Sequence, residues 1–310
     1  MMDDIDIAGV RLTHPDKVLY PEQAITKRAL AEYFDAVADW ILPHAAGRPI
    51  SLVRCPMGRA KKCFFQRHAG SGIPPQIHEV QISGFEESGA YLYFSDKAGL
   101  IALVQMGVLE MHPWGSRIDK PERPDRMIFD LDPGAGLAFA DVVKAARALR
   151  AFLETIGLMS FVKTTGGKGL HLVVPIARRY SWADVKSFAK AVGDAMAAHE
   201  PQHYLTRISI AERRGRIFID YLRNDPTSTA IAPYSTRARE GAPVATPLSW
   251  DELSEKLDPR AFGIDSVPKR LQRLKQDPWA AMSGLHQTLP AAEKLLQKPP
   301  GTPTRSQVKV

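Results

Sequence analysis

Long apolar runs are missing from this sequence. Its 310 residues contain no stretch near the roughly 18 consecutive apolar residues that a membrane-spanning helix needs. The first six residues, Met1 to Asp6, are acidic rather than basic, and no apolar signal-peptide core follows them. We therefore expect no association with a membrane and no secretion.

Cysteine is also scarce, with only Cys55 and Cys63 in the whole chain. A chain of this length with two cysteines is not a disulfide-based scaffold, so a cytoplasmic location is expected. His68 lies close to both cysteines in the sequence, but a structural zinc site needs a fourth ligand that is not apparent. A zinc site is therefore not predicted.

Acidic residues are fewer than basic ones, 34 against 41, which gives a net charge of +7 and a pI of about 9.3. This balance favours a polyanionic partner, and nucleic acid is the first candidate. The 45% of hydrophobic residues is enough for a folded core. There is no internal repeat, and residues 290–310 are rich in Pro, Lys, Ser and Thr, which predicts a flexible tail or linker.

Apolar spacing and turn residues predict interspersed helices and strands. The predicted helices cover residues 27–40 (with Thr26 as N-cap), 98–109, 139–157 (ending at Gly157) and 182–198. The predicted strands cover residues 49–54, 77–83, 126–132, 159–164, 170–175 and 216–220, with a short strand or turn at 12–20.

Two aspartates, Asp130 and Asp132, stand at the end of the apolar strand 126–132 and precede a Pro-Gly turn. Side chains alternate along a strand, so both carboxylates project from one face while Phe129 and Leu131 project from the other. Two anions this close repel each other unless a cation lies between them, which favours a Mg²⁺ or Mn²⁺ site. The alternative is a surface turn whose aspartates cap the next helix.

Asp220 repeats this pattern at the end of the strand 216–220. If the two strands are neighbours, three carboxylates converge, as in a two-metal phosphoryl-transfer site. A single aspartate at a strand end is more often structural, but the Asp130–Asp132 pair favours the metal site.

The turn from Lys163 to His171 carries the sequence Thr165-Gly-Gly-Lys168-Gly. Consecutive glycines let backbone N–H groups approach phosphate oxygens, and Thr165, Lys168 and His171 add polar groups. The spacing does not fit a Walker A loop. The alternative is a plain glycine hairpin with a core histidine. Further guanidinium groups follow downstream, from Arg223, Arg237 and Arg239, although any one of them alone is as easily a surface charge.

Two N-terminal features suit a polynucleotide. Lys17 and Lys27, with His14 nearby, bracket the turn into the first helix and can bind a terminal phosphate. The segment 59–68 interleaves basic residues with Phe64 and Phe65, as a base-stacking surface requires. The alternative is that one phenylalanine belongs to the core, and Phe65 is the better candidate for that.

The motifs Phe-Asp-Leu-Asp-Pro (129–133), Thr-Gly-Gly-Lys-Gly-Leu-His (165–171) and Phe-Ile-Asp-Tyr-Leu-Arg-Asn (218–224) resemble the polymerase domain of bacterial ATP-dependent DNA ligase D. That family belongs to the archaeo-eukaryotic primase superfamily. The resemblance extends from Leu12 to about residue 285. It implies an α+β fold with a central, largely antiparallel sheet and flanking helices. It further implies one domain over residues 1–289, with an N-terminal α/β, DNA-binding portion to about residue 110 and a catalytic core over 111–289.

The resemblance also implies roles for individual residues. Asp130, Asp132 and Asp220 match the catalytic carboxylates that bind two Mn²⁺ or Mg²⁺ ions. The nucleotide-binding residues implied are Thr165, Lys168, His171, Arg223, Arg237, Arg54 and His112, the last of these beside the sugar. The DNA-binding residues implied are Phe64 and Phe65 for template bases, and Lys17, Lys27 and His14 for a 5′-phosphate. Some relatives have Asn in place of His14 and Ser in place of Thr165.

The expected activity is template-dependent addition of nucleotides, with NTPs preferred over dNTPs, to a 3′-hydroxyl at gaps or ends bearing a 5′-phosphate. The expected setting is non-homologous end joining in the bacterial cytoplasm, at the nucleoid, with a DNA ligase and an end-bridging protein as partners. The ligase and nuclease modules of relatives do not fit in this chain, so an excised domain or a stand-alone primase-polymerase is expected. The other readings are a haloacid-dehalogenase-type phosphatase, because of the Asp-Leu-Asp motif, and a non-catalytic DNA-end-binding module.

Overall fold

The computed structural model describes residues 4–84 and 89–291, so most of the expected tail at 290–310 lies outside the described residues. The helices are α1 (Lys27–Ala36), α2 (Ala38–Ala45), α3 (Lys97–Gln105), α4 (Phe139–Thr155), α5 (Trp182–His199) and α6 (Ser266–Leu271). The N-terminal strands are β1 (Ile5–Ile7), β2 (Val10–Leu12), β3 (Val18–Tyr20), β4 (Ile25–Thr26), β5 (Ile50–Arg54), β6 (Phe64–Gln66), β7 (His78–Val80), β8 (Tyr91–Tyr93) and β9 (Val108–Pro113). The remaining strands are β10 (Arg126–Pro133), β11 (Phe161–Thr164), β12 (Leu170–Pro175), β13 (Tyr204–Leu205), β14 (Ile217–Asp220) and β15 (Pro247–Leu248).

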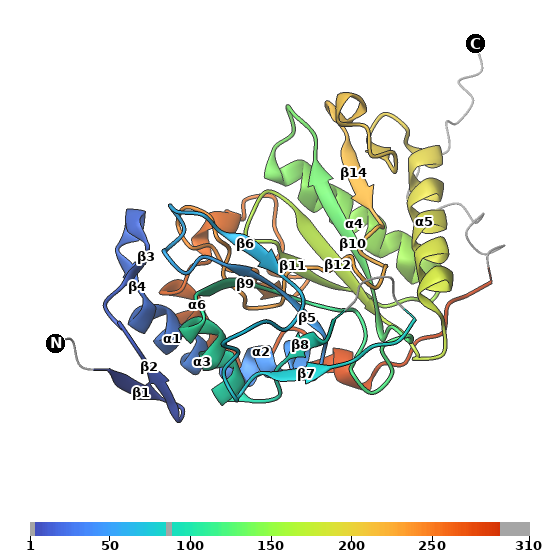
Figure 1. Cartoon of the computed structure of the whole chain (residues 1–310). Coiled ribbons are helices and arrows are strands. Elements are labelled where there is room, and N and C mark those ends of the chain that lie inside the picture. Colours follow the sequence, from blue (N-terminus) through green and yellow to red (C-terminus); the bar gives the residue numbers. More distant parts are fainter. Residues whose placement is uncertain (1–3, 85–88, 292–310) are drawn as a thin grey trace, which may run out of the picture.

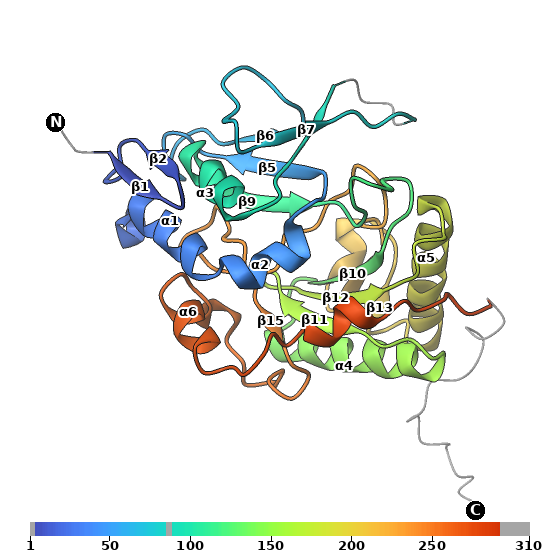
Figure 2. The ribbon, with the colours of Figure 1, turned by 90° about the horizontal axis from the view of Figure 1, so that it is seen from below.

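The centre of the molecule is a six-stranded sheet in the order β13-β14-β10-β12-β11-β15 (Figure 1). All neighbours are antiparallel except β13 and β14. Helices α4 and α5 pack on one face of β10, where Met127, Phe129 and Leu131 are fully buried. In Figure 2, α4 lies on one side of the sheet, and β5, β6 and β9 lie on the other. The predicted α+β fold with a largely antiparallel sheet is confirmed.

The opposite face of β10 carries the alternate residues, Ile128, Asp130 and Asp132. Ile128 packs there with Val173 and the buried Trp279 in a small apolar cluster. Asp130 and Asp132 follow on the same face, farther along the strand. The alternation of β10 therefore buries one face under two helices and turns both carboxylates toward the N-terminal portion of the chain.

The N-terminal portion carries a second sheet, in the order β6-β5-β8-β7, with β9 also paired to β5. Hydrogen bonds fix this portion to the later part of the chain. The Tyr33 hydroxyl donates to the carbonyl of Tyr234 (2.8 Å), and the Thr236 hydroxyl donates to the carbonyl of Leu109 (2.7 Å). A single large apolar cluster includes side chains from both portions. Strand β9 is thereby held in a fixed position relative to the central sheet.

Most predicted elements are present, but two predicted helices are shorter than expected. The helix expected over 27–40 ends at Ala36, and α2 follows from Ala38; the Thr26 hydroxyl accepts a hydrogen bond from the Ala29 N–H, as an N-cap does. The helix expected over 98–109 ends at Gln105, because Gly107 has a φ of +78° and the chain turns into β9. A Cβ at Gly107 would lie 2.9 Å from the Pro56 Cα, so a glycine is required there.

Cys55 and Cys63 are joined in a disulfide, which the sequence analysis did not predict. The bond closes the loop between β5 and β6, immediately before Phe64. Both sulfur atoms are therefore engaged with each other rather than with a metal. Among residues 4–84 and 89–291, no helix has the length and apolar character required to cross a membrane.

Asn224, the one asparagine of the chain, continues the pairing of β10 beyond the end of β14. Its amide oxygen accepts from the Ile128 N–H (2.8 Å), and its amide nitrogen donates to the Ile128 carbonyl (2.7 Å). Asn224→Ala leaves both buried backbone groups unpaired, so we expect the free energy of unfolding to fall by about 3 kcal/mol. Urea denaturation measures this change. The exposed control Gln202→Ala is expected to change it by less than about 0.5 kcal/mol, and an equal loss in both variants would contradict the assigned role.

Candidate active site

Four titratable side chains form a row across neighbouring strands of the central sheet. Antiparallel register places Asp220 opposite Asp130, Asp130 opposite His171, and His171 opposite Lys163. All four residues are buried, with relative exposures between 2% and 7%. Asp220 and Asp130 are thus brought side by side, as the sequence predicted for strands that are neighbours. Lys163 was not predicted as part of this row.

Asp132 lies two residues beyond Asp130 on the same strand face, at the wall of a cavity of about 400 Å³. Both aspartates line this cavity. The other predicted residues that line it are Thr165, Lys168, His171, Arg223, Arg237 and His112, together with Arg239. Arg213 also lines it and was missed; it belongs to the basic segment Arg213-Arg214-Gly215-Arg216, whose position beside the cavity the sequence does not reveal. The cavity therefore combines two carboxylates with five cationic side chains.

Arg223 supplies positive charge between the strand-end carboxylates. Its Nη2 lies 3.2 Å from Asp130 Oδ2, and its Nε lies 3.6 Å from Asp220 Oδ2. Asp220 is further anchored because its Oδ1 accepts a hydrogen bond from the Leu222 N–H (2.7 Å). On the other side, His171 Nε2 lies 3.3 Å from Asp130 Oδ1. Asp130 is thus held between an imidazole and a guanidinium.

The pKa values of the two aspartates of β10 are shifted in opposite directions. Burial disfavours the charged form of Asp130, but His171 and Arg223 outweigh burial and hold its pKa well below the usual range. Burial, and then the negative charge of Asp130, raise the pKa of Asp132 to about 6. Burial and the charge of Lys163 lower the pKa of His171 to about 4, so this ring is neutral near pH 7. Of the two aspartates of β10, only Asp132 therefore has a raised pKa.

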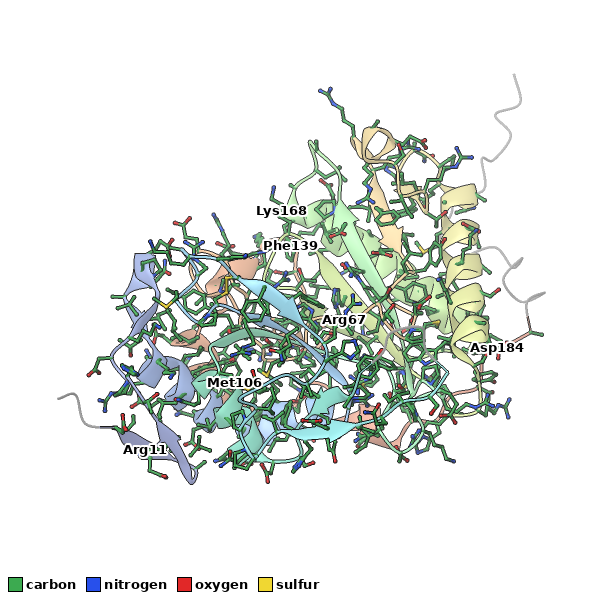
Figure 3. All side chains as sticks on the ribbon, viewed as in Figure 1. Arg11, Arg67, Met106, Phe139, Lys168 and Asp184 are labelled. Atoms are coloured by element: carbon green, nitrogen blue, oxygen red, sulfur yellow. A yellow bond between two sulfur atoms is a disulfide. The ribbon has the colours of Figure 1, made fainter. Side chains whose placement is uncertain are left out.

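The glycine-rich turn between β11 and β12 approaches the carboxylates closely. A Cβ at Gly169 would lie 2.7 Å from the Leu131 carbonyl oxygen and 3.2 Å from Asp132 Oδ1, so only glycine fits. Gly166 has a φ of +65°, and its Cβ would meet the Arg237 side chain at 2.6 Å. Figure 3 shows Lys168 near Phe139, with which it lines an adjoining cavity of about 950 Å³. The turn therefore brings Lys168 to the boundary of both cavities.

Glu110 connects two of the predicted residues and was itself missed. Its carboxylate contacts His112 Nε2 (2.9 Å) and Arg237 Nε (3.0 Å), and it accepts a hydrogen bond from the Ala238 N–H (2.8 Å). Arg237 in turn donates to the Thr165 carbonyl (2.7 Å). A sequence signal was present, since Glu110 lies two residues before His112 and shares its strand face. This spacing places Glu110 in the site only once β9 is known to border the cavity.

A separate cavity of about 400 Å³ brings together the predicted end-recognition residues Lys17, Lys27 and His14. Arg54 also lines this cavity and not the one that holds the aspartates, so its expected position beside the nucleotide is not what the structure shows. Lys27 Nζ donates to the Thr13 carbonyl and to Gln105 Oε1, both at 2.8 Å. His14 has a φ of +51°, a left-handed conformation that asparagine also adopts readily.

Phe64 and Phe65 are both exposed, at 43% and 50%. The alternative that Phe65 belongs to the core is therefore wrong. The Arg54 guanidinium lies 5.3 Å from the Phe64 ring centre, and the Arg67 guanidinium lies 5.4 Å from that of Phe65. The Phe65 ring lies 5.9 Å from that of His112. Phe64 and Phe65, together with the guanidinium groups of Arg54 and Arg67, thus form an exposed aromatic and positively charged surface between the two cavities.

Within residues 4–84 and 89–291, no three His, Cys, Asp or Glu side chains are arranged so that together they could hold a metal ion. Asp130 and Asp132 nevertheless have the chemistry of a divalent-cation site. Asp130 Oδ1 is buried without a hydrogen bond of normal geometry among these residues, and Asp130 raises the pKa of Asp132. Carboxylate oxygens of this kind fit Mg²⁺ or Mn²⁺.

Comparisons with known proteins agree with this geometry. Residues 26–279 match the family model described as "LigD, primase-polymerase domain". The multifunctional non-homologous end joining protein LigD of Pseudomonas aeruginosa is 38% identical over 92% of this chain, and that of Mycolicibacterium smegmatis is 33% identical over 92%. The chain spans 34% and 37% of the lengths of these two relatives. A solved structure, the polymerase domain from Mycobacterium tuberculosis ligase D in complex with DNA, has a TM-score of 0.83 and 32% identity, covering 90% of this chain and 99% of that one.

The fold and the carboxylate-lined cavity define a domain of the primase-polymerase type. The match to the family model extends over most of the chain, and it includes Asp130, Asp132, Asp220 and the glycine-rich turn. The chain belongs to the LigD primase-polymerase domain family. This membership disfavours the haloacid-dehalogenase-type phosphatase.

The raised pKa of Asp132 gives a prediction about stability in a metal-free buffer with EDTA. Because the folded-state pKa of about 6 lies above the ordinary aspartate pKa of 3.8, ionisation of Asp132 costs stability as the pH rises to 6. Asp132→Asn mimics the protonated form. We expect this variant to be more stable than the wild type by about 1–2 kcal/mol at pH 7.5, since Asp132 is partly exposed to solvent.

The gain should vanish near pH 4, where the wild-type carboxyl is protonated in the folded state. Urea denaturation at several pH values measures it, with the exposed Asp251→Asn as a matched control. A gain that is the same at pH 4 and pH 7.5 would contradict the assigned electrostatics.

Proposed function

We propose that this chain is a template-dependent nucleotidyltransferase. It adds nucleotides, with ribonucleotides preferred, to a 3′-hydroxyl at gaps or broken DNA ends that bear a 5′-phosphate. The observation that carries this proposal is the cavity in which Asp130 and Asp132 face a set of cations. These cations are Lys168, Arg213, Arg223, Arg237 and Arg239. A nucleoside triphosphate with divalent ions is the ligand that needs both kinds of charge in one cavity.

Asp130 and Asp132, with Asp220 beside them, are the residues that would hold Mn²⁺ or Mg²⁺. Two such ions lower the pKa of an attacking hydroxyl and neutralise charge on the departing pyrophosphate. Asp130 Oδ1 is buried and has no hydrogen bond of normal geometry within residues 4–84 and 89–291, and Asp132 gains from a nearby cation because its pKa is raised. Arg223 is the group that would exchange its contact with Asp130 for one with phosphate.

The other side chains bind and orient the nucleotide. The N–H groups of the Gly166–Gly169 turn suit phosphate oxygens, and Lys168 adds positive charge to the cavity. The Thr165 hydroxyl donates to the Gly169 carbonyl (3.1 Å) and would exchange this bond for one to a phosphate oxygen. Arg237 and Arg239 lie against the same turn, since their side chains approach Gly166 and Gly167. His171 is neutral and buried beside Asp130, so its single ring proton, placed on Nε2, serves to orient that carboxylate. These fixed donors stabilise the charge that develops during phosphoryl transfer.

The cavity with Lys17, Lys27 and His14 is proposed to bind the 5′-phosphate of the strand across the gap. Arg54 lines this cavity, so we reassign it from the nucleotide to the DNA end. Phe64 and Phe65, exposed and flanked by Arg54 and Arg67, are proposed to stack on template bases between the two cavities. The structural neighbour from Mycobacterium tuberculosis is described as bound to DNA, which supports a DNA-binding role for these surfaces.

The relatives are named as non-homologous end joining proteins, which supports end joining as the setting of this activity. On this basis we propose a DNA ligase and an end-bridging protein as partners, and a bacterial, nucleoid-associated location. A stand-alone role in primer synthesis or gap repair is the second enzymatic candidate. A non-catalytic DNA-end-binding module is the alternative of another class, and the test below distinguishes it.

Primer extension on a gapped duplex with a 5′-phosphate, with Mn²⁺ and NTPs, tests the proposed activity. Asp132→Ala removes a carboxylate that would hold the metal, so we expect incorporation to fall by at least about 10³-fold while DNA binding by fluorescence anisotropy changes little. The exposed control Asp251→Ala is expected to extend the primer like the wild type. DNA binding without any extension by the wild type would favour the non-catalytic module.

Lys27 makes the preference for a phosphorylated end depend on pH. Burial, and then the charge of Lys17, lower the pKa of Lys27 to about 8, so the side chain is cationic at pH 7 and largely neutral at pH 9. We expect the affinity ratio of 5′-phosphate over 5′-hydroxyl ends to fall by about tenfold between these pH values. Anisotropy titrations with both DNAs measure this ratio.

Lys27→Arg keeps its charge, so its ratio should vary less with pH, while Lys27→Ala should have a low ratio throughout. The exposed Lys256→Ala is the control and should follow the wild type. A wild-type ratio that rises with pH would contradict the role of Lys27.

A further inference from the structure

Glu110 is a buried carboxylate at the edge of the nucleotide cavity, and no role has so far been given to it. It is 6% exposed and lies on β9, two residues before His112. One oxygen, Oε2, contacts His112 Nε2 at 2.9 Å. The other, Oε1, accepts from the Ala238 N–H and lies 3.0 Å from Arg237 Nε. The Glu110 side chain therefore contacts both His112 and Arg237, two residues that line the cavity.

Burial and the neighbouring groups shift the pKa values of both Glu110 and His112. Burial opposes ionisation of Glu110, but His112, Arg237 and the Ala238 N–H outweigh it and lower its pKa to about 2. Burial lowers the pKa of His112 in spite of Glu110, so the ring is neutral near pH 7. Glu110 is then an ionised carboxylate that can only accept hydrogen bonds, and His112 carries a single ring proton.

These two facts determine the tautomer of His112. The carboxylate acceptor at Nε2 requires the ring proton to be on Nε2. Nδ1 is then the atom with a lone pair, and His112 can offer only an acceptor at that nitrogen. Because His112 lines the cavity beside Asp130 and Thr165, this acceptor suits a ligand group that donates a hydrogen bond. The Phe65 ring, 5.9 Å away, limits the space in which the imidazole can turn.

We propose that Glu110 is a positioning residue, which fixes His112 with an acceptor nitrogen available to the sugar and so selects a nucleotide whose 2′-substituent donates a hydrogen bond. The proposal rests on the proposed nucleotidyltransferase function. It extends that function by stating which property of the 2′-group is recognised. A 2′-hydroxyl donates and a 2′-hydrogen does not, so the preference for NTPs over dNTPs follows.

Extension by a single nucleotide with four substrates tests this directly. The 2′-hydroxyl and 2′-amino nucleotides can donate, and the 2′-deoxy and 2′-fluoro nucleotides cannot. We expect kcat/KM for the wild type to be about tenfold higher for the 2′-amino than for the 2′-fluoro substrate, the effect of one hydrogen bond. Comparable kcat/KM for these two substrates would overturn the proposal while the polymerase function stands. No incorporation of any substrate would instead overturn the function itself.

Glu110→Gln reverses the polarity at His112. The carbonyl oxygen of the introduced glutamine would face the donors Ala238 N–H and Arg237, and its amide N–H₂ would face His112 Nε2. Because an amide N–H₂ only donates, Nε2 would have to accept, and the ring proton should move to Nδ1. The ratio of 2′-amino over 2′-fluoro should then fall toward one. A general weakening of phosphate binding through Arg237 acts on both substrates and cancels in the ratio. In the His112→Ala background, Glu110→Gln should leave the ratio unchanged, and a further change there would contradict action through His112.

The exposed Glu154→Gln is the matched control and should keep the wild-type ratio. If Glu110→Gln does not fold, the substrate ratio and the histidine NMR of the wild-type protein still test the proposal. Nitrogen-15 NMR of labelled histidine should show Nδ1 of His112 unprotonated and Nε2 protonated at pH 7.5. A protonated Nδ1 would overturn the proposal.

Discussion

The antiparallel register of β14, β10, β12 and β11 is the constraint on which the site depends. It places Asp220, Asp130, His171 and Lys163 in one line across the sheet, and all four side chains are buried. Like charges this close destabilise the fold unless opposite charges lie among them. Arg223 provides that opposite charge for Asp130, and the neutral His171 adds a hydrogen-bonding contact, whereas burial and the charge of Asp130 keep the pKa of Asp132 raised. The sheet thus holds a charge imbalance at the point where a divalent cation and a triphosphate would be bound.

The N-terminal portion completes this site rather than forming a separate unit. Strand β9 brings Glu110 and His112 to the cavity, and β6 brings Phe64 and Phe65 to the surface next to it. Hydrogen bonds such as that between Thr236 and Leu109 hold β9 in place over the central sheet. The aspartate-lined cavity, the aromatic surface and the lysine-lined cavity are therefore arranged in fixed order. Under the proposed function, these three sites would take the nucleotide, the template bases and the 5′-phosphate across the gap in that order.

Much of this arrangement follows from local sequence patterns. The alternation along 126–132 correctly predicted that Asp130 and Asp132 share a face. The glycines of 165–169 predicted a phosphate-binding turn, but not that this turn lies against the two aspartates, which the structure shows. What the sequence could not provide depends on long-range packing. Glu110 and Lys163 are ordinary charged residues in apolar strands until the register of β9 and β11 is known. The helix predicted over 98–109 was too long, because apolar residues on β9 continue the pattern past the turn at Gly107. Arg54 lines the cavity of Lys17 and Lys27, a placement that depends in part on its hydrogen bond to the Met106 carbonyl, 52 residues away in the sequence.

The central claim is that Asp130 and Asp132 form a cation site whose charge Arg223 balances when no cation is bound. Anomalous diffraction at the manganese edge, from crystals grown with Mn²⁺ and a non-hydrolysable NTP, tests it most directly. The account predicts a manganese peak in contact with both carboxylates, and Arg223 displaced from Asp130 toward phosphate. Manganese bound elsewhere, with Arg223 still paired to Asp130 and Asp220, would contradict the account.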